Sequence, residues 1–445
     1  MPGTPFDSAL LSRLFFTGEV GRLFSDSAEV RAMMLVEGAL AKVQGAAGVI
    51  PELSAAAIHR ASLELQIDPA GLAAASGQNG VTVPGLVSAF RELMQAPEHA
   101  RFLHWGATSQ DIQDTALMLR MRQVLGHYGT ALDAILAALA ALAGRHAGLP
   151  VAARTYGQVA TPTSFGAQVA GWGWPLLALR GELDTLGPDV LWVSLSGAAG
   201  TGSELGDEAP ALRAALAQAL ALNDPGRTWH SDRTPIARLS AWMARAAAAL
   251  GKMGEDLILA TQSGMAEVRL GAAGGSSTMP QKQNPVGPSA LVALGRHAQG
   301  LNATLQGAAA HRQARDGAAW FTEWLALPQL CLTLASALFH AQTLAEGLGP
   351  VPETMAGPLG GAGLIYAEAL SFALTDRMPR PEAQAAVKEL CQRVMAGEGS
   401  LPGLALERWP DLPQTVFDPA ARTGQAPAEA RAFAQAVAER GAADA

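Results

Sequence analysis

The sequence predicts an all-α fold of three domains with a long central helical bundle. Three long stretches repeat apolar residues at spacings of three and four, which is the seam of a helix packed nearly parallel to its neighbours. No run of alternating β-branched residues is long enough to build a sheet, and only residues 191–196 have the composition of a short extended piece. The 48 glycines and the 49% hydrophobic content suit helices that approach one another closely.

The length of the chain predicts its division into domains. At 445 residues it is long for a single compact core, which favours two or three domains. We expect an N-terminal helical domain over residues 1–115, a central long-helix bundle over 116–360 and a small C-terminal helical domain over 361–445. The last boundary follows from a change to shorter helical patterns and proline-containing loops.

The charge balance limits the partners that the chain can bind. A net charge of −8 and an isoelectric point near 5.6 give no general attraction to nucleic acid or to an anionic membrane, so we expect neither partner. An anionic substrate would need cations concentrated locally. The two cysteines, Cys331 and Cys391, lack metal-ligand spacing; they are compatible with one disulfide but favour two buried thiols in a cytosolic protein.

Two stretches bear on targeting and membranes. The first residues have neither a basic start nor an apolar core, so we expect no signal peptide and a cytoplasmic location. Residues 324–345 carry no formal charge and resemble a membrane span in composition. Pro328 and several polar residues interrupt them, and their apolar side chains are periodic, which favours a buried bundle helix.

In chain order, residues 27–47 give the first clear helical pattern. The N-terminal domain then ends in the loop 104–111, which reads His-Trp-Gly-Ala-Thr-Ser-Gln-Asp. A Thr-Ser-x-Asp cluster before an apolar periodic run is typical of a helix N-terminus, with Thr108 or Ser109 as the cap. Such a terminus with hydroxyl groups also makes a site for a carboxylate.

Three long helices form the predicted bundle, and each has one apolar seam. The seams are Leu117, Met121, Val124, Tyr128, Leu132, Ile135, Leu139 and Leu142; Ile236, Leu239, Met243, Ala246, Leu250, Met253 and Leu257; and Trp320, Trp324, Leu327, Cys331, Leu334, Leu338 and Ala341. Other helical patterns lie near 163–185, 206–222 and 286–308, which predicts an elongated bundle.

Polar segments lie between the seams. Residues 154–162 read Arg-Thr-Tyr-Gly-Gln-Val-Ala-Thr-Pro and have the composition of a loop before a helix capped near Thr163. His230 and Arg233 precede the second seam, and Arg315 precedes the third. Residues beside helix starts are ordinarily capping or solvated groups. An anionic substrate gives them a second interpretation, because its site needs local cations.

Residues 275–285, called the signature loop below, read Gly-Ser-Ser-Thr-Met-Pro-Gln-Lys-Gln-Asn-Pro. Glycine and two prolines exclude them from a helix interior. The loop combines backbone N–H groups, two Ser hydroxyls, the Lys282 ammonium and the Asn284 amide, which are donors of the kind that stabilise a developing oxyanion. A polar surface loop between helices is the alternative.

Three regions of the chain resemble, in order, the three signature regions of the fumarase/aspartase superfamily. The signature loop matches every fixed position of the string Gly-Ser-Ser-x-Met-Pro-x-Lys-x-Asn-Pro. Residues 104–111 are similar to the His-x-Gly-x-Thr-Ser-x-Asp region, and residues 154–162 to the Thr-His-x-Gln-x-Ala-x-Pro region, with Tyr156 in place of the His. The resemblance implies a homotetramer whose active sites are assembled from different subunits.

The resemblance also implies roles for individual residues. Ser276 matches the catalytic serine, which acts as proton carrier, and Lys282 and Asn284 complete the catalytic set around an aci-carboxylate intermediate. No metal is implied. The substrate contacts implied by the resemblance are His104, Thr108, Ser109, Arg154, Thr155, Tyr156, Gln158, His230, Arg233, Ser277, Met279 and Arg315.

Tyr156 distinguishes among the reactions of the superfamily. A lyase that expels an amine or water needs an acid such as His, whereas the group that leaves carbon in a cycloisomerase is a carboxylate, which needs none. The whole chain is similar to the bacterial cycloisomerases of 3-carboxy-cis,cis-muconate, in which an aromatic residue also follows Arg-Thr. This resemblance implies cofactor-free lactonisation of a tricarboxylate diene to 4-carboxymuconolactone, in protocatechuate breakdown by the β-ketoadipate pathway.

Departures from the cycloisomerase pattern leave further functions open. Val159, Gln283 and Ala314 stand where that family usually has polar or basic groups, which points to a paralogue acting on a related polycarboxylate. A second possibility is a fumarate-releasing lyase of the adenylosuccinate or argininosuccinate type, against which Tyr156 argues. The third is a non-catalytic protein that kept the fold, against which the intact Ser276 and Lys282 argue.

Overall fold

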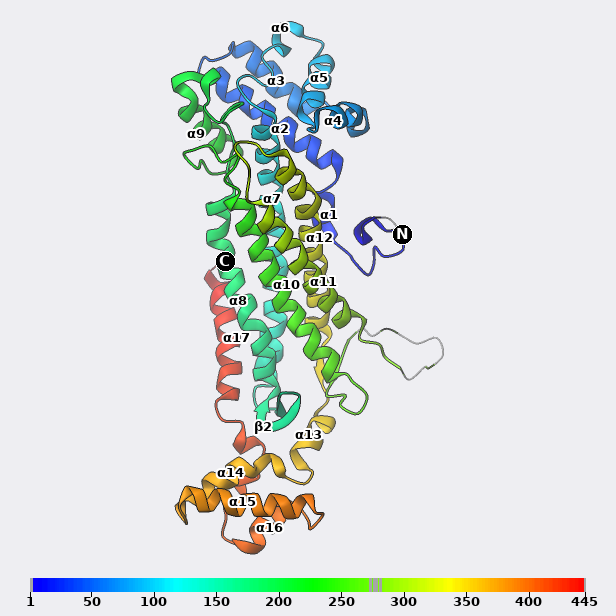
Figure 1. Ribbon diagram of the computed structural model, residues 1–445, viewed down its shortest axis with the longest axis vertical. Coiled ribbons are helices and arrows are strands. Elements are labelled where there is room, and N and C mark those ends of the chain that lie inside the picture. Colours follow the sequence, from blue (N-terminus) through cyan, green and yellow to red (C-terminus); the bar gives the residue numbers. More distant parts are fainter. Residues whose placement is uncertain (1–2, 272–273, 275–278, 280–281, 444–445) are drawn as a thin grey trace. The chain divides into compact units, whose positions relative to one another are not determined.

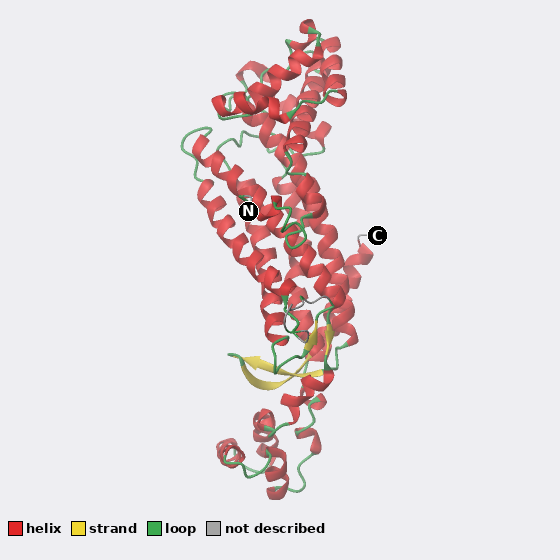
Figure 2. Cartoon of the chain, turned by 90° about the vertical axis from the view of Figure 1, so that its right-hand side faces the viewer, coloured by secondary structure: helices red, strands yellow, loops and turns green. Residues whose placement is uncertain are grey.

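The computed structural model describes residues 3–271, 274, 279 and 282–443. In these residues the chain forms seventeen α-helices, several short 3₁₀ turns and two two-stranded sheets (Figure 1). Figure 2 shows the strands as a few short pieces among helices. The predicted all-α fold is confirmed.

The helices and strands follow one another along the chain with few long connections. The helices are α1 (Gly18–Arg22), α2 (Asp26–Ala46), α3 (Glu52–Glu64), α4 (Ala73–Asn79), α5 (Val83–Met94), α6 (Pro97–Ala100), α7 (Ser109–Arg145), α8 (Phe165–Val190), α9 (Ala209–Leu220), α10 (Thr234–Ala260), α11 (Val286–Ala308), α12 (Gly317–Gly347), α13 (Pro352–Gly360), α14 (Ala367–Ala373), α15 (Arg380–Met395), α16 (Leu401–Arg408) and α17 (Ala426–Ala443). The strands are β1 (Pro150–Thr155), β2 (Gln158–Ser164), β3 (Val268–Arg269) and β4 (Gly349–Pro350).

The chain divides into two compact units, each made of three segments, and the five long helices α7, α8, α10, α11 and α12 contribute residues to both. The first unit contains Met1–Ala131, Leu179–Ala248 and Ala293–Phe339, and the second contains Leu132–Ala178, Ala249–Val292 and His340–Ala445. Within the second unit, buried residues between 370 and 416 form a hydrophobic cluster of their own. The three domains expected from the sequence stay a prediction.

In the first unit the three predicted seams meet in one core. The Tyr128 hydroxyl on α7 donates to the Cys331 carbonyl oxygen on α12 at 2.7 Å, and the Cys331 sulfur lies 3.8 Å from that of Met243 on α10. All three residues are buried. Burial raises the pKa of the Cys331 thiol to about 12, which makes it an inert core residue. Cys391 is partly buried, and both thiols are free.

Residues 150–164 form a β-hairpin in place of the loop expected at 154–162. Strands β1 and β2 pair antiparallel, with Arg154 opposite Val159. Tyr156 and Gly157 make the two-residue turn with φ of 52° and 73°, as a type I′ turn requires. The prediction was wrong because Tyr is an unusual first residue for this turn, and because β2 contains Pro162 and neither strand alternates regularly between buried and exposed residues. Helix α8 follows, and the Ser164 hydroxyl caps it by accepting from the Ala167 N–H at 3.1 Å.

Two helices of the described residues, α7 and α12, are long and apolar enough to cross a membrane by length and composition alone. Most of the apolar window of α12 is buried inside the protein, as in a core helix. Its seam residues Leu327, Leu334 and Leu338 are each almost wholly inaccessible to solvent. Helix α12 is therefore buried in the way that we predicted for a bundle helix over residues 324–345.

Candidate active site

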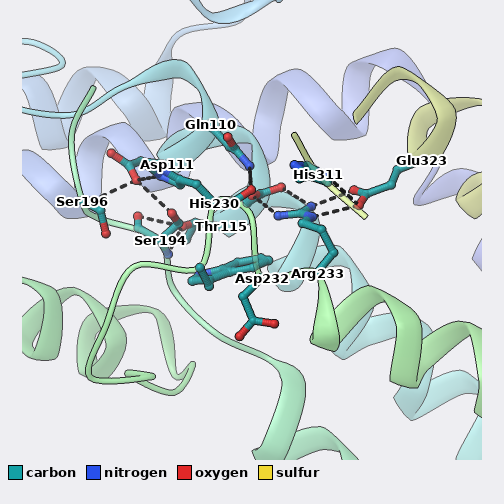
Figure 3. A network of polar contacts seen from close by, with 12 residues as sticks. Gln110, Asp111, Thr115, Ser194, Ser196, His230, Asp232, Arg233, His311 and Glu323 are labelled. Carbon is teal, nitrogen blue, oxygen red and sulfur yellow. Dashed lines mark hydrogen bonds and ion pairs between the residues drawn. The ribbon is translucent and has the colours of Figure 1, made fainter. Parts of the chain in front are cut away.

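A fully buried carboxylate, Asp111, lies in the first turn of α7 and belongs to the first unit. Its two oxygens contact five polar groups, and Figure 3 shows those of Ser194, Ser196 and His230. The partners are the Ser194 hydroxyl (2.8 Å), the Ser196 N–H (3.0 Å) and His230 Nε2 (2.7 Å) on Oδ1, and the N–H groups of Thr108 (3.0 Å) and Gly197 (2.9 Å) on Oδ2. One charge therefore ties together three segments that are distant in the sequence.

The contact with Thr108 fixes the start of α7. Thr108 directly precedes the helix, and its N–H donates to the side chain of Asp111 three residues later, as in a capping box. The helix N-terminus predicted at Thr108 and Ser109 is therefore confirmed. The first N–H groups of α7 and its dipole favour an anion at this end, and the side chain of Asp111 supplies one. That Thr108 and Ser109 also contact a substrate carboxylate stays a prediction.

His230 is held in the same cluster. The buried Trp229 donates its indole N–H to the Val193 carbonyl oxygen at 2.9 Å and so fixes the neighbouring backbone. With Nε2 of His230 on Asp111, Nδ1 is buried and has no hydrogen-bond partner among the described residues. Neither ring nitrogen is open to a ligand in this conformation, so we assign His230 a positioning role in place of the predicted substrate contact.

A second buried network surrounds Arg233 (Figure 3). Its guanidinium donates to both oxygens of Asp114 (2.7 and 3.0 Å) and to both oxygens of Glu323 (2.8 and 2.7 Å). Burial alone would lower the pKa of Arg233, but the charges of Asp114 and Glu323 raise it. Because this cation is buried and its donors are engaged, we assign Arg233, too, a positioning role and not the predicted substrate contact.

His311 lies at the edge of this network. Its Nε2 is 3.9 Å from the Glu323 carboxylate, and its side chain is almost wholly buried. Burial, together with the charge of Arg233, lowers the pKa of His311, so the ring is neutral at pH 7. The buried charges of this cluster are therefore two carboxylates and one guanidinium.

His104 has the left-handed backbone that few non-glycine residues adopt, with φ of 65°. Its Nδ1 lies 2.6 Å from the carboxylate of Glu37, whose side chain is fully buried. Burial alone would lower the pKa of His104, but the Glu37 charge and hydrogen bond outweigh it and raise the pKa. His104 is therefore a partly exposed group that the fold favours in its cationic form.

Arg315 also has a left-handed backbone, with φ of 61°. Its Nη1 donates to the Ala198 carbonyl oxygen at 3.2 Å, and Ala198 directly follows Gly197, which is bound to Asp111. The Arg315 residue is half-buried, whereas Arg233 is fully buried. The first unit thus brings Thr108, His230 and, through Ala198, Arg315 to the segments that Asp111 joins.

The second unit carries the predicted residues of the hairpin. Thr155, Tyr156 and Gln158 are exposed, and the Tyr156 side chain at the tip has full solvent exposure. Arg154 instead makes a two-pronged ion pair with Glu267, at 2.8 and 2.9 Å. A cavity of about 620 Å³ beside the pair is lined by Arg154, Val159, Glu267 and Glu353 among others.

The signature loop lies only partly within the described residues. Ser276 and Ser277, the predicted proton carrier and its neighbour, fall outside them. Met279 and Lys282 are exposed. Asn284 exchanges two backbone hydrogen bonds with Gly274, at 2.8 and 3.0 Å, so the two ends of the loop are paired.

Five carboxylates with a clear role were missed at the level of sequence: Glu37, Asp111, Asp114, Glu267 and Glu323. A signal was available for three of them. Asp111 and Asp114 lie one turn apart at the start of an apolar helix, and Glu323 lies between two tryptophans of the third seam. Acidic residues on a buried helix face need cationic or N–H partners. The spacing of the acidic residues does not show which residues those partners are.

Comparison with known proteins identifies similar chains. The sequence matches the Lyase family over residues 18–300. It is 36% identical to the 3-carboxy-cis,cis-muconate cycloisomerase of Pseudomonas aeruginosa over 430 residues, which cover 94% of each chain. It is also 36% identical to the nitrosuccinate lyase of Streptomyces davaonensis over 398 residues, covering 85% of this chain and 83% of that one.

Solved structures agree with this picture. The 3-carboxy-cis,cis-muconate lactonizing enzyme from Pseudomonas putida is similar with a TM-score of 0.89 and 32% identity, covering 96% of this chain and 99% of that one. A fumarate lyase from Mesorhizobium sp. BNC1 has a TM-score of 0.88 and 30% identity, covering 95% of this chain and 98% of that one.

The Asp111 cluster makes a first prediction about stability. Asp111→Asn keeps the side-chain volume but replaces one acceptor oxygen by a donor amide that faces N–H groups, at a cost of about 2–4 kcal/mol. We expect the midpoint of thermal unfolding to fall, as measured by differential scanning calorimetry. Asp207→Asn, at an exposed position of the same unit, should leave the midpoint unchanged. Equal midpoints for the two variants would contradict the role of Asp111.

The His104–Glu37 pair makes a second prediction, about pH. The folded pKa of His104 lies above its ordinary value of 6.5, so its stabilisation is complete below about pH 6.5 and is lost as the pH rises through the folded pKa. The difference in unfolding temperature between the native protein and His104→Asn should therefore shrink from pH 5.5 to 9. His127→Asn, at an exposed position of α7, should show no such trend. A difference that grows with pH would refute the assignment.

Proposed function

This chain belongs to the lyase family of the fumarase/aspartase superfamily, and we propose that it lactonises 3-carboxy-cis,cis-muconate to 4-carboxymuconolactone in protocatechuate catabolism. It is an enzyme, because its relatives across nearly the whole chain are cycloisomerases and lyases. Four curated cycloisomerases of this substrate match it at 32–36% identity, in each case over at least 87% of the chain.

One observation favours a cycloisomerase over a lyase that expels an amine or water. Tyr156 occupies the hairpin position at which lyases of the superfamily carry the acidic His, and its side chain is exposed at the tip of the turn. A phenol is a weaker acid than an imidazolium. Lactonisation requires no acid at that oxygen, because an ionised carboxylate of the substrate is the nucleophile in one direction and the leaving group in the other.

The proposed reaction is an isomerisation that moves one proton. A substrate carboxylate oxygen adds to a carbon of the diene, and negative charge develops on the carboxylate attached to the neighbouring carbon. A proton is then delivered to that carbon, so the ionised substrate with three carboxylates takes up one proton and becomes a lactone with two. Counted as neutral acids, substrate and product have the same atoms, and no cofactor takes part. Ser276 is the proposed proton carrier, and Lys282 and Asn284 are the proposed donors to the aci-carboxylate.

Three substrate carboxylates need cations or N–H groups. Arg154 and Arg233 are engaged by carboxylates of the protein itself, at distances of 2.7–3.0 Å. We therefore propose His104, Arg315 and Lys282 as the cations that bind the substrate, with the N-terminus of α7 at Thr108 and Ser109 as an additional carboxylate site. Thr155, Tyr156, Gln158, Ser277 and Met279 keep their proposed roles as contacts.

We also propose a homotetramer with active sites shared between subunits, and a cytoplasmic location. The exposed hairpin tip supports active sites that are shared between subunits. The tip residues that we propose as substrate contacts are exposed to solvent, so a second protein surface is needed to enclose the substrate. Exposed apolar residues of α12, namely Phe321, Trp324 and Leu325, supply area that association would bury. Two free cysteines suit a reducing compartment.

Substitution of Ser276 tests the proton carrier. Ser276→Ala should lower kcat on 3-carboxy-cis,cis-muconate by about 10²–10⁴-fold, which is the range for loss of an acid–base group. Sedimentation and circular dichroism should report an unchanged fold and oligomer. Ser289→Ala, at an exposed position in the first turn of α11, is the matched control and should retain full activity. Retained activity in Ser276→Ala would remove this serine from the mechanism.

A lyase acting on a related succinate is the second candidate, because the chain is as similar in identity to the nitrosuccinate lyase as to the cycloisomerase of Pseudomonas aeruginosa. We expect the purified enzyme to remove the absorbance of the muconate diene and to form the lactone, identified by mass spectrometry. Adenylosuccinate, argininosuccinate and nitrosuccinate should release no fumarate in a coupled fumarase assay. Fumarate release at a rate above that of lactone formation would reject the cycloisomerase.

A further inference from the structure

We propose that Glu267 is a positioning residue for this reaction. Through its ion pair with Arg154, it holds the β1–β2 hairpin against the chain segment that leads into the signature loop. The inference rests on the proposed function for its catalytic consequence, but its structural part can be tested independently. All residues involved belong to the second unit.

The ion pair has the geometry of a rigid connection. Nη1 and Nη2 of Arg154 donate to the two carboxylate oxygens of Glu267 at 2.9 and 2.8 Å. The side chain of Glu267 is 6% exposed and that of Arg154 is 22% exposed. A two-pronged pair of this kind fixes both distance and orientation, and its low exposure limits screening by water and salt.

The Glu267 end of the pair is anchored to the base of the signature loop. Its N–H donates to the Ala260 carbonyl oxygen at the end of α10, and its carbonyl oxygen accepts from the Val351 N–H, both at 2.8 Å. Strand β3 begins at the next residue and pairs with β4. Gly271 then passes so close to Gly347 that a Cβ on Gly271 would lie 2.6 Å from the Gly347 Cα. The carboxylate therefore projects from a tightly held backbone.

The Arg154 end of the pair is two residues from the hairpin tip. Arg154 is opposite Val159, and the next pair, Thr155 and Gln158, flanks the turn. A two-stranded hairpin is only marginally stable without further packing, and its last residues before the turn are exposed. The ion pair therefore supplies a side-chain anchor close to the residues that we propose as substrate contacts, Thr155, Tyr156 and Gln158.

The alternative, a direct contact between Arg154 and the substrate, disagrees with the charges around it. Both terminal nitrogens of Arg154 already donate to Glu267. The adjoining cavity is lined by Glu267 and Glu353, and Arg154 is the only cationic residue among its described lining residues. A cavity with two carboxylates and one engaged guanidinium does not favour a tricarboxylate anion.

The experiment compares Glu267→Gln, Glu267→Asp, Arg154→Gln and the double variant Arg154→Gln/Glu267→Gln with the native enzyme. Hydrogen exchange of residues 150–164, followed by mass spectrometry, reports the anchoring without reference to activity. Steady-state kinetics on 3-carboxy-cis,cis-muconate report its catalytic effect. Asp411→Asn is the control, because Asp411 makes a similar two-pronged pair with Arg377 at 2.7 and 2.8 Å in the same unit, on the exposed surface.

We expect faster exchange of the hairpin in Glu267→Gln and in Arg154→Gln, and no change in Asp411→Asn. Loss of the anchor should lower kcat by about 10–100-fold, the scale for misplacement of a contact by roughly 1 Å, while KM changes less than kcat. Glu267→Asp, which keeps the charge, should recover part of the activity. The double variant should be no slower than either single variant, because both substitutions break the same pair.

Two results would overturn the proposal. Unchanged hairpin exchange in Glu267→Gln would show that the pair does not anchor the hairpin. A rise in KM confined to Arg154→Gln, with a normal KM in Glu267→Gln, would show instead that Arg154 binds the substrate directly. If the native enzyme itself does not turn over the muconate, the proposed function fails, while the exchange data still decide whether Glu267 anchors the hairpin.

Discussion

The buried charge of Asp111 is the constraint on which the first unit depends. A carboxylate without water is stable only if donors replace its hydration, and here they come from Thr108, from residues 194–197 and from His230. Movement of any one of these segments would leave the charge unsatisfied. The start of α7 and the loop that precedes α10 are therefore positioned together, although they are more than one hundred residues apart in the sequence.

The requirement that a buried carboxylate has donor partners also divides the cations of this acidic protein into two groups. Arg154 and Arg233 neutralise buried carboxylates, and each connects segments of its own unit that are distant in the sequence. His104, Arg315 and Lys282 keep accessible polar atoms, and His104 is favoured as a cation by the buried Glu37. A sequence motif does not tell these two groups of cations apart. It shows that an arginine is present in a signature region, but not whether that arginine binds a substrate or a neighbouring carboxylate.

The features that follow from local periodicity were predictable, and those that depend on distant partners were not. The seams meeting at Tyr128, Met243 and Cys331 and the helix start at Thr108 follow from spacing and capping rules. The hairpin was missed because Tyr156 is an unusual residue at its turn position. The partners of Arg233 lie 119 and 90 residues away, which no local pattern reveals. Ser276 was found by resemblance alone and lies outside the described residues.

Three of the predicted positions share an uncommon backbone conformation. His104, Tyr156 and Arg315 are among the seven described non-glycine residues with positive φ, a conformation that costs an ordinary residue about 1 kcal/mol or more. Glycine would adopt it at lower cost at each position. The other four are Gln95, Ala221, Ala266 and Gln313, so a left-handed backbone does not by itself mark a functional residue. What distinguishes His104, Tyr156 and Arg315 from those four is an ionisable side chain, which is the kind of group that we propose binds a polycarboxylate.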